Sequence, residues 1–221
     1  MTTRGADQRL IGLARTLGRT AIRRNPRNRV LPALLLVTDP QRTPDPLAAA
    51  ARLPRGAGVI YRAFGHPGAV EIGRALAALC RRRGLVLLVG ADEALAARIG
   101  ARGLHLPERD LARARRVAAR RPGWILTGAA HSGAALARAA DCGLAAALLS
   151  PVFESNSPSA KRALGSLRFA RLARPARLPV YALGGINGDT ALRLASSGAV
   201  GLAAVEALSL PSLRKSGGPI A

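Results

Sequence analysis

Eight short apolar runs, each separated from the next by a helix-like segment, are the feature that most constrains the fold of this chain. Each run leads into a small or polar loop and then into a stretch rich in Ala, Leu and Arg with helical periodicity. Strands that alternate with helices form parallel sheets, and near-continuous apolar runs are typical of strands covered on both faces. The runs are Ala33 to Val37, Gly58 to Arg62, Leu85 to Val89, Gly103 to Leu106, Trp124 to Gly128, Leu144 to Leu149, Val180 to Leu183 and Val200 to Ala204.

Eight such units predict an α/β protein with a closed (β/α)8 TIM barrel, short for that fold and therefore built with tight loops. The helix-like segments lie near 46–52, 68–82, 92–100, 108–120, 132–141, 166–173 and 188–197, and the residues after Val205 are a candidate for the eighth helix. A doubly wound open sheet is the competing architecture. The first run is not followed by a Gly-x-Gly-x-x-Gly turn, which removes the main reason to prefer a dinucleotide-binding version.

Residues 1–29 form a separate basic zone with eight arginines and one aspartate. Within it, Leu10, Leu13, Ala14, Leu17 and Ala21 recur at the spacing of one helix face. Two interpretations are open, a basic helix on a membrane surface and an extra helix packed on the barrel. The apolar face is modest and carries no aromatic anchor, which favours packing. We therefore expect an N-terminal helical extension over 1–29, the barrel over 30–210 and a C-terminal tail over 211–221.

The charge of the chain predicts a preference for anions. Lys and Arg number 34 against 12 Asp and Glu, for a formal net charge of +22, and only Lys161 and Lys215 are lysines. The arginines are dispersed among alanines and no helix-turn-helix, zinc finger or RNA-binding signature accompanies them, so small phosphorylated metabolites are the expected partners rather than nucleic acid. Cys80 and Cys142 have no partner at metal-ligand spacing, and we expect no disulfide.

No apolar run reaches the roughly 20 residues that a membrane span requires, so we expect a cytoplasmic protein. The sequence is compatible with a homo-oligomer and does not fix the number of subunits.

Two segments at the ends of predicted strands have the composition of ligand-binding loops. Leu183-Gly184-Gly185-Ile186-Asn187 follows the seventh run, and a paired glycine there lets backbone amides approach a phosphate; a plain strand-to-helix turn with Asn187 as N-cap is the alternative. The connection 150–165 after the sixth run carries hydroxyls, an amide and the cations Lys161 and Arg162, a donor set suited to a pyrophosphate. A solvated loop without function is the alternative for that connection.

Four segments together resemble the thiamine phosphate synthase family and its sister, the thiazole tautomerase TenI. They are Leu36-Val37-Thr38-Asp39, Gly103-Leu104-His105-Leu106, Ser150-Pro151-Val152-Phe153 and the stretch from Pro179 to Ile186. The resemblance covers about residues 33–208, in order and at matching spacing. It implies coupling of hydroxymethylpyrimidine diphosphate to thiazole phosphate with release of pyrophosphate, a dissociative reaction that needs Mg2+ and cations on the leaving group.

The resemblance assigns roles to several residues of this chain. It implies that Arg62 contacts pyrophosphate, that Asp110 binds the metal, that Gly184 and Gly185 bind the thiazole phosphate, and that Ser155 and Ser157 lie in the pyrophosphate loop. His131 falls where the family carries a histidine, which in the tautomerase branch moves protons on the thiazole. Taken alone, each of these residues also has an ordinary structural interpretation, as a helix start, a turn or an exposed loop residue.

Other positions depart from the family pattern. The Gln-x-Arg-x-Lys stretch reads Ile60-Tyr61-Arg62-Ala63-Phe64, and the metal-binding Asn-Asp pair aligns with Gly90-Ala91. Asp92 and Lys161 are the candidate replacements for the lost metal carboxylate and the loop lysine. The small hydroxyl that meets phosphate after the eighth strand aligns with Glu206.

These departures leave three hypotheses. A thiamine phosphate synthase, a transferase with catalytic candidates His131 and Lys161 and a Mg2+ site of Asp110 and Asp92, is the leading one. A Mg2+-independent tautomerase of the TenI kind fits the retained His131. A catalytically silent phosphometabolite-binding paralogue is the third.

Overall fold

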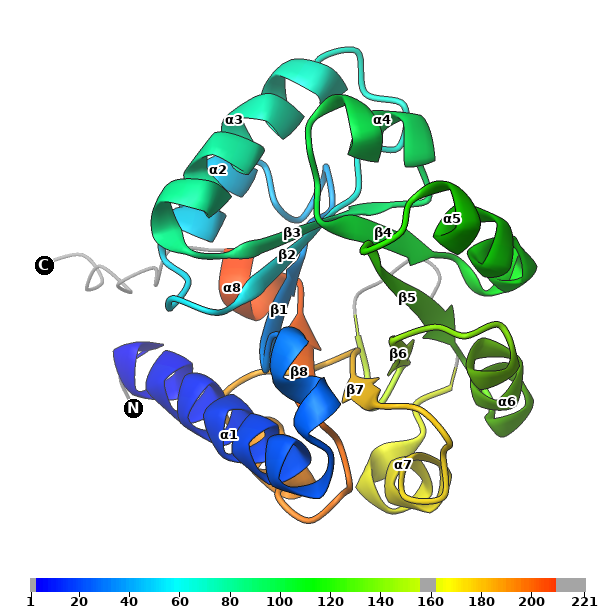
Figure 1. Cartoon of the computed structure of the whole chain (residues 1–221). Coiled ribbons are helices and arrows are strands. Elements are labelled where there is room, and N and C mark those ends of the chain that lie inside the picture. The colour runs from blue at the N-terminus through cyan, green and yellow to red at the C-terminus, as the bar shows by residue number, and fades with distance from the viewer. Residues whose placement is uncertain (1–2, 156–161, 210–221) are drawn as a thin grey trace, which may run out of the picture.

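The computed structural model describes residues 3–155 and 162–209, and its eight parallel strands close into a barrel (Figure 1). Each strand pairs with the next along the chain, and β1 pairs with β8 through Leu35 and Ala203. This closure confirms the predicted TIM barrel and excludes the open sheet. The strands are β1 Leu34–Val37, β2 Gly58–Tyr61, β3 Val86–Gly90, β4 Gly103–Leu106, β5 Ile125–Ala130, β6 Ala146–Leu149, β7 Val180–Ala182 and β8 Gly201–Ala204.

Helices surround the barrel at most of the predicted places. They are α1 Thr3–Arg24, α2 Pro46–Ala51, α3 Ala69–Arg83, α4 Glu93–Arg98, α5 Ala114–Arg120, α6 Gly133–Asp141, α7 Gly165–Ala173 and α8 Glu206–Ser209, with the 3-10 helices η1 Pro26–Val30, η2 Glu108–Arg113 and η3 Ala191–Leu194. The helix-like segment predicted over 188–197 forms only in part, as the 3-10 helix η3. The predicted segment 108–120 divides into η2 and α5.

The N-terminal helix α1 packs on the barrel, as the favoured interpretation predicts. Leu10, Ala14, Leu17 and Ala21 are buried, and α1 contacts β1, β8 and η3. In a TIM barrel the helix after the eighth strand normally covers this part of the wall. Here α8 has four residues and contacts α2, so α1 supplies the missing cover (Figure 1).

The strands alternate between two apolar layers. Side chains such as Leu34, Leu36 and Val59 face the helices, whereas Leu35, Ile60 and Tyr181 belong to a second cluster inside the barrel. The buried hydroxyl of Tyr181 donates to the carbonyl oxygen of Pro32 at 2.6 Å. Because side chains alternate along a strand, the residue two positions after Ile60, which is Arg62, also points inward at the carboxyl end of the barrel.

Within the part of the chain that the structure describes, no helix is both long enough and apolar enough to cross a membrane.

Candidate active site

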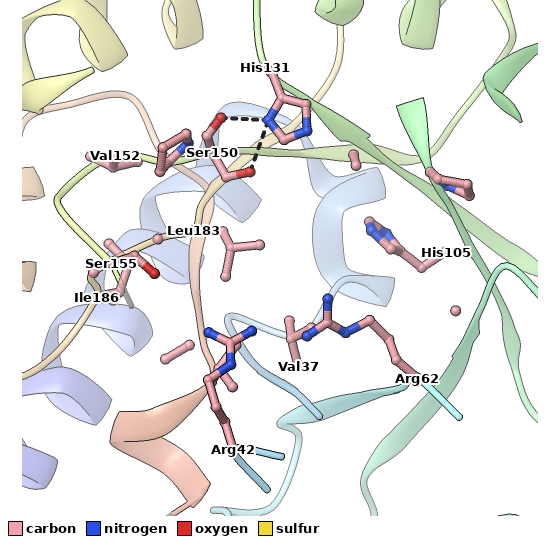
Figure 2. Close-up of a pocket in the computed structure, with 18 of the residues that line it drawn as sticks. Val37, Arg42, Arg62, His105, His131, Ser150, Val152, Ser155, Leu183 and Ile186 are labelled. Atoms are coloured by element: carbon pink, nitrogen blue, oxygen red, sulfur yellow. Dashed lines mark hydrogen bonds between the residues drawn. The ribbon is translucent and has the colours of Figure 1, made fainter. Parts of the chain in front are cut away.

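A cavity of about 2040 Å³ opens at the carboxyl ends of the strands, where TIM barrels hold their active sites. Figure 2 shows Arg42 and Arg62 projecting into it from one side, His131 and Ser150 on another, and Ser155 and Ile186 on a third. The lining is both apolar and polar, as is typical of a small-molecule site. The cavity brings together most of the described residues that sequence analysis nominates: Arg62, Asp92, His131, Ser155, Gly184 and Gly185.

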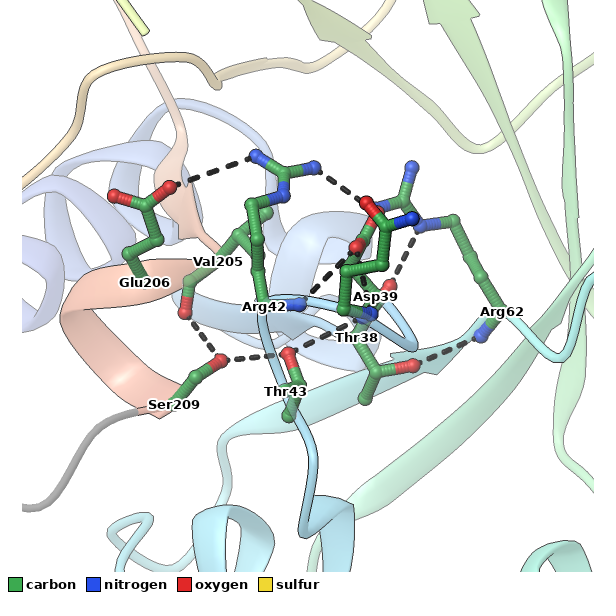
Figure 3. Close-up of polar contacts among 9 residues, drawn as sticks. Thr38, Asp39, Arg42, Thr43, Arg62, Val205, Glu206 and Ser209 are labelled. Atoms are coloured by element: carbon green, nitrogen blue, oxygen red, sulfur yellow. Dashed lines mark hydrogen bonds and ion pairs between the residues drawn. The ribbon is translucent and has the colours of Figure 1, made fainter. Parts of the chain in front are cut away.

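Two arginines on one wall share one carboxylate. Nη2 of Arg62 and Nη2 of Arg42 each lie 3.1 Å from Oδ2 of Asp39 (Figure 3). Nε of Arg62 also donates to the carbonyl oxygen of Thr38 at 2.7 Å, and its backbone N–H donates to the Thr38 hydroxyl at 3.0 Å. These contacts fix the Arg62 guanidinium at the end of β2 and align it with Arg42.

The charges of this group change the acidity of its members. Burial would raise the pKa of the Asp39 carboxyl, but hydrogen bonds and charge from Arg42, together with the charge of Arg62, lower it below its ordinary value. Burial lowers the pKa of Arg62, and the charge of Asp39 partly opposes that change. Asp39 therefore carries its negative charge under ordinary conditions and holds both cations in place.

Sequence analysis missed Arg42. It lies in the connection between β1 and α2, in the turn-forming context Pro40-Gln41-Arg42-Thr43-Pro44. Asp39 Oδ1 accepts the backbone N–H groups of Gln41 and Arg42 at 3.2 and 3.3 Å. An aspartate that accepts amides two and three residues later is a turn signal that could have placed this loop over the strand end.

His131 follows β5, and hydrogen bonds hold both its backbone and its ring. Its backbone N–H donates to Oε2 of Glu108 at 2.9 Å, and its Nδ1 lies 2.8 Å from the carbonyl oxygen of Ser150. A carbonyl oxygen only accepts, so Nδ1 carries the proton in this contact. With the proton on Nδ1, the tautomer that this contact selects has Nε2 as its acceptor nitrogen, which is the atom that a general base uses.

A second histidine, His105 on β4, lies buried inside the barrel beneath the cavity. Its Nδ1 lies 3.0 Å from the Thr127 hydroxyl. Burial, and then the charge of Arg62, lower the pKa of His105 to about 4. His105 is therefore neutral at pH 7, and it forms part of the cavity lining.

The glycine turn after β7 packs against the chain that follows β6. The carbonyl oxygens of Leu183 and Gly184 accept the N–H groups of Val152 and Phe153 at 2.9 and 3.0 Å. Both glycines have positive φ, and a Cβ on Gly185 would lie 2.3 Å from the carbonyl oxygen of Glu154. Glycine is thus required here by the packing of two loops, and the turn lines the cavity, while its predicted role in phosphate binding stays a prediction.

Asn187 does not cap a regular helix. Its Oδ1 accepts the N–H groups of Asp189 and Thr190 at 2.9 and 3.0 Å, and its own N–H donates to the Thr190 hydroxyl. The residues form a closed turn before η3. The N–H of Ala191 also donates to the Asn187 carbonyl oxygen at 3.0 Å, and the helix that follows is the four-residue 3-10 helix η3.

The residues proposed for Mg2+ do not fit a metal site. Oδ1 of Asp92 accepts the N–H of Leu95 at 2.8 Å as the N-cap of α4. Asp110 lies outside the cavity lining, and its Oδ2 faces Arg113 Nη1 at 3.7 Å. Among residues 3–155 and 162–209, no group of three or more His, Cys, Asp and Glu side chains is placed to hold a metal ion.

Two nominated residues, Ser157 and Lys161, lie outside the described residues, so their predicted roles stay predictions. Ser155 is described and lines the cavity.

The departures from the family pattern have visible consequences. Ile60 is buried inside the barrel, whereas the exposed Phe64 places its ring under the Arg62 guanidinium, 5.2 Å from centroid to Cζ. A Cβ on Gly90 would lie 2.8 Å from Cγ of Arg62, so glycine at this position makes room for the arginine. Ala91 has a φ of 64°, and Glu206 Oε1 lies 3.9 Å from Arg42 Nη1.

Comparison with known proteins points to one family. The model of thiamine monophosphate synthase matches residues 34–208. The thiamine-phosphate synthase of Alcanivorax borkumensis is 35% identical over 191 residues, which cover 80% of this chain and 85% of that protein. The thiamine biosynthesis bifunctional protein ThiED of Geobacter sulfurreducens is 31% identical over 195 residues, covering 86% of this chain and 39% of that protein.

The thiamine-phosphate synthase of Thioalkalivibrio sulfidiphilus is 36% identical over 137 residues, or 60% of this chain and 64% of that protein. The chain thus spans less than two thirds of the length of several relatives. Among solved structures, thiamine phosphate pyrophosphorylase from Pyrococcus furiosus aligns with a TM-score of 0.72 at 23% identity, covering 86% of this chain and 93% of that chain. This last likeness concerns the fold.

Proposed function

This chain belongs to the thiamine monophosphate synthase family, and from that premise we propose that it couples hydroxymethylpyrimidine diphosphate to thiazole phosphate. The C–O bond between the pyrimidine methylene and the diphosphate breaks, and its electron pair leaves with pyrophosphate. The thiazole ring nitrogen donates its lone pair to the methylene carbon and forms the new C–N bond. The reaction is a transfer within thiamin biosynthesis, and its substrates are small phosphorylated metabolites.

The observation that carries this proposal is the placement of two anion-binding elements on different walls of one cavity. Arg42 and Arg62 supply fixed positive charge on the side of β1 and β2. The turn of Gly184 and Gly185 also lines the cavity, and Ile186, which follows it, lies with Ser155 on a different side from the two arginines (Figure 2). A dissociative reaction depends on stabilising charge on the leaving group, which preorganised cations do at no reorganisation cost.

The arrangement suits two phosphorylated substrates bound together. We expect the diphosphate on the arginine side and the thiazole phosphate at the glycine turn, with the two reacting atoms between them. Holding both partners in one cavity lowers the entropic part of the barrier. Ser157 and Lys161 are expected to complete the diphosphate side, and a cytoplasmic location stays a prediction.

The test is an assay of the purified full chain with both precursors, with MgCl2 and with EDTA, following thiamin phosphate as its fluorescent oxidation product. We expect product from the wild-type chain and from Arg82→Gln, which removes an exposed charge on α3. Arg62→Gln should lower kcat/KM at least about tenfold, since it removes a charged donor. No product from the wild-type chain under either condition would overturn the proposal.

One observation favours a second function, thiazole tautomerase. The contact between His131 Nδ1 and the Ser150 carbonyl oxygen fixes the tautomer that leaves Nε2 as a base. His131→Ala should then abolish aromatisation of the thiazole precursor while the fold stays intact. The matched control is His66→Ala, since His66 is exposed and lies outside the cavity lining. Retained turnover in His131→Ala would exclude this function.

A further inference from the structure

Arg42 and Arg62, here called the arginine pair, form a cationic surface, and the carboxylate of Asp39 that binds both of them is hidden from the cavity. Both arginines line the cavity, and Asp39, which binds them, does not. A ligand that enters therefore meets the guanidinium groups rather than Asp39, and the Glu206 carboxylate, 3.9 Å from Arg42 Nη1, is the acidic group beside them in the lining. The two guanidinium groups repel each other, and the negative charge of the Asp39 carboxylate behind them offsets this repulsion and holds them close together.

Asp39 has no capacity left for a cation. Its Oδ1 accepts two backbone N–H groups, from Gln41 and Arg42, and its Oδ2 accepts both guanidinium groups. A divalent cation at this carboxylate would have to displace an arginine. Asp39 thus acts as an organiser of the arginine pair rather than as a metal ligand.

The pair still has donors to offer. Nη1 of Arg62 makes no hydrogen bond or ion pair with any residue that the structure describes. Nη1 of Arg42 faces only Glu206 Oε1, at 3.9 Å, which is beyond hydrogen-bond distance. The terminal nitrogens of these two neighbouring guanidinium groups match the oxygens of a phosphoryl group, which arginine binds in a forked geometry.

The pair lies beside the position that lost its metal ligands. Gly90 lies at the end of β3, and the Arg62 side chain packs directly against it. A Cβ on Gly90 would lie only 2.8 Å from Cγ of Arg62 and would clash with it. Asp92 is engaged at the start of α4, and Asp110 lies outside the cavity lining. Arg62 therefore packs closely against a position where the family carries a metal ligand and this chain carries none.

We infer that the arginine pair binds the pyrophosphate group directly and replaces the divalent cation, so that this chain binds pyrophosphate without Mg2+. The inference rests on the proposed function for the identity of the ligand. Arg42 is the residue that this inference adds to the pyrophosphate site, because it supplies a second positive charge next to Arg62. The role of Asp39 is to position both.

The experiment is isothermal titration of the purified full chain with sodium pyrophosphate, once in EDTA and once in MgCl2. We expect binding in EDTA, and a loss of affinity of about tenfold in Arg42→Gln, the size expected for a charged hydrogen bond. Arg82→Gln, which removes the same charge from an exposed site on α3, should bind as the wild type does. Binding that appears only with MgCl2 would overturn the inference, as would unchanged affinity in Arg42→Gln.

A second variant covers the case in which Arg42→Gln fails to fold. Arg42→Lys keeps the charge and loses the fork, so it should bind more weakly in EDTA than the matched Arg82→Lys. Equal affinity of these two variants would count against the arginine pair. If pyrophosphate binds in EDTA and this binding depends on Arg42, but no thiamin phosphate forms, the inference holds and the proposed function is overturned. If thiamin phosphate forms but pyrophosphate binds only with Mg2+, the proposed function holds and the inference is overturned.

Discussion

Gly90 is the residue on which the shape of the arginine wall depends. A Cβ at this position would lie 2.8 Å from Cγ and 3.6 Å from Cβ of Arg62, so the arginine must move if the glycine gains a side chain. We expect Gly90→Ala to weaken pyrophosphate binding about tenfold and to lower the free energy of unfolding by about 1 kcal/mol, at the low end of overpacking costs. Titration calorimetry and denaturant unfolding measure the two effects.

The control for this change is Gly12→Ala, because a Cβ on Gly12 in α1 meets nothing within 4 Å. It should leave pyrophosphate affinity unchanged. If Gly90→Ala binds as tightly as Gly12→Ala, Gly90 does not position Arg62.

His105 makes the stability of the barrel depend on pH. Its pKa is lowered from 6.5 to about 4 in the folded chain, so between these values the unfolded chain binds more protons than the folded one. The free energy of unfolding therefore falls as the pH drops from 6.5 towards 4. Between pH 7 and pH 5 we expect this one group to contribute a loss of about 2 kcal/mol.

Urea unfolding at the two pH values measures this loss, with His105→Gln as the comparison because glutamine does not titrate and can still bond to Thr127. The variant should lose about 2 kcal/mol less than the wild type over the same interval. An identical loss in both chains would show that His105 is not the group responsible.

At the scale of elements, α1 is part of the barrel wall rather than an appendage. Leu17 is 4% exposed on the face that packs against the barrel. Leu17→Ala should lower the free energy of unfolding by about 2–5 kcal/mol, as buried leucine deletions do. The matched change Leu167→Ala removes a side chain that is 78% exposed, on α7, and should have little effect. Equal losses in denaturant unfolding would contradict a structural role for α1.

The elements also show how far the sequence predicts the fold. Periodicity and run length place all eight strands within two residues, because strands covered on both faces must be apolar. Over 188–197 the predicted helix-like segment forms only in part, as the four-residue 3-10 helix η3 after a turn at Asn187 and Thr190. Apolar spacing over so short a segment does not distinguish a 3-10 helix from an α-helix.

The site is predicted less completely than the fold, for a related reason. The sequence places Asp92 and Asp110 near strand ends, but it does not reveal that Asp92 is used as a helix cap or that Asp110 faces Arg113. Arg42 lies in a loop whose position depends on Asp39 accepting two amides and two guanidinium groups at once. These shared contacts form only when the loop folds over the end of β1, so the order of residues in the sequence does not reveal them.

At the scale of the whole molecule, the excess of 34 Lys and Arg over 12 Asp and Glu creates a net positive field that attracts anions. The arginine pair is then expected to bind phosphorylated ligands among the anions that this field attracts. Encounter is the step that such a field accelerates, and salt screens it over a Debye length of about 10 Å at 0.1 M ionic strength.

We therefore expect kcat/KM for the diphosphate substrate to fall about tenfold when ionic strength rises from about 0.02 to about 0.2 M, with kcat nearly constant. Steady-state kinetics in NaCl measure both constants. Arg82→Gln should follow the wild-type dependence closely, because one exposed charge in a net charge of +22 changes the field little. If kcat falls in parallel with kcat/KM, salt weakens the contacts of the arginine pair with the bound substrate rather than the encounter step. Salt-independent kcat/KM would mean that the net charge plays no part in substrate capture.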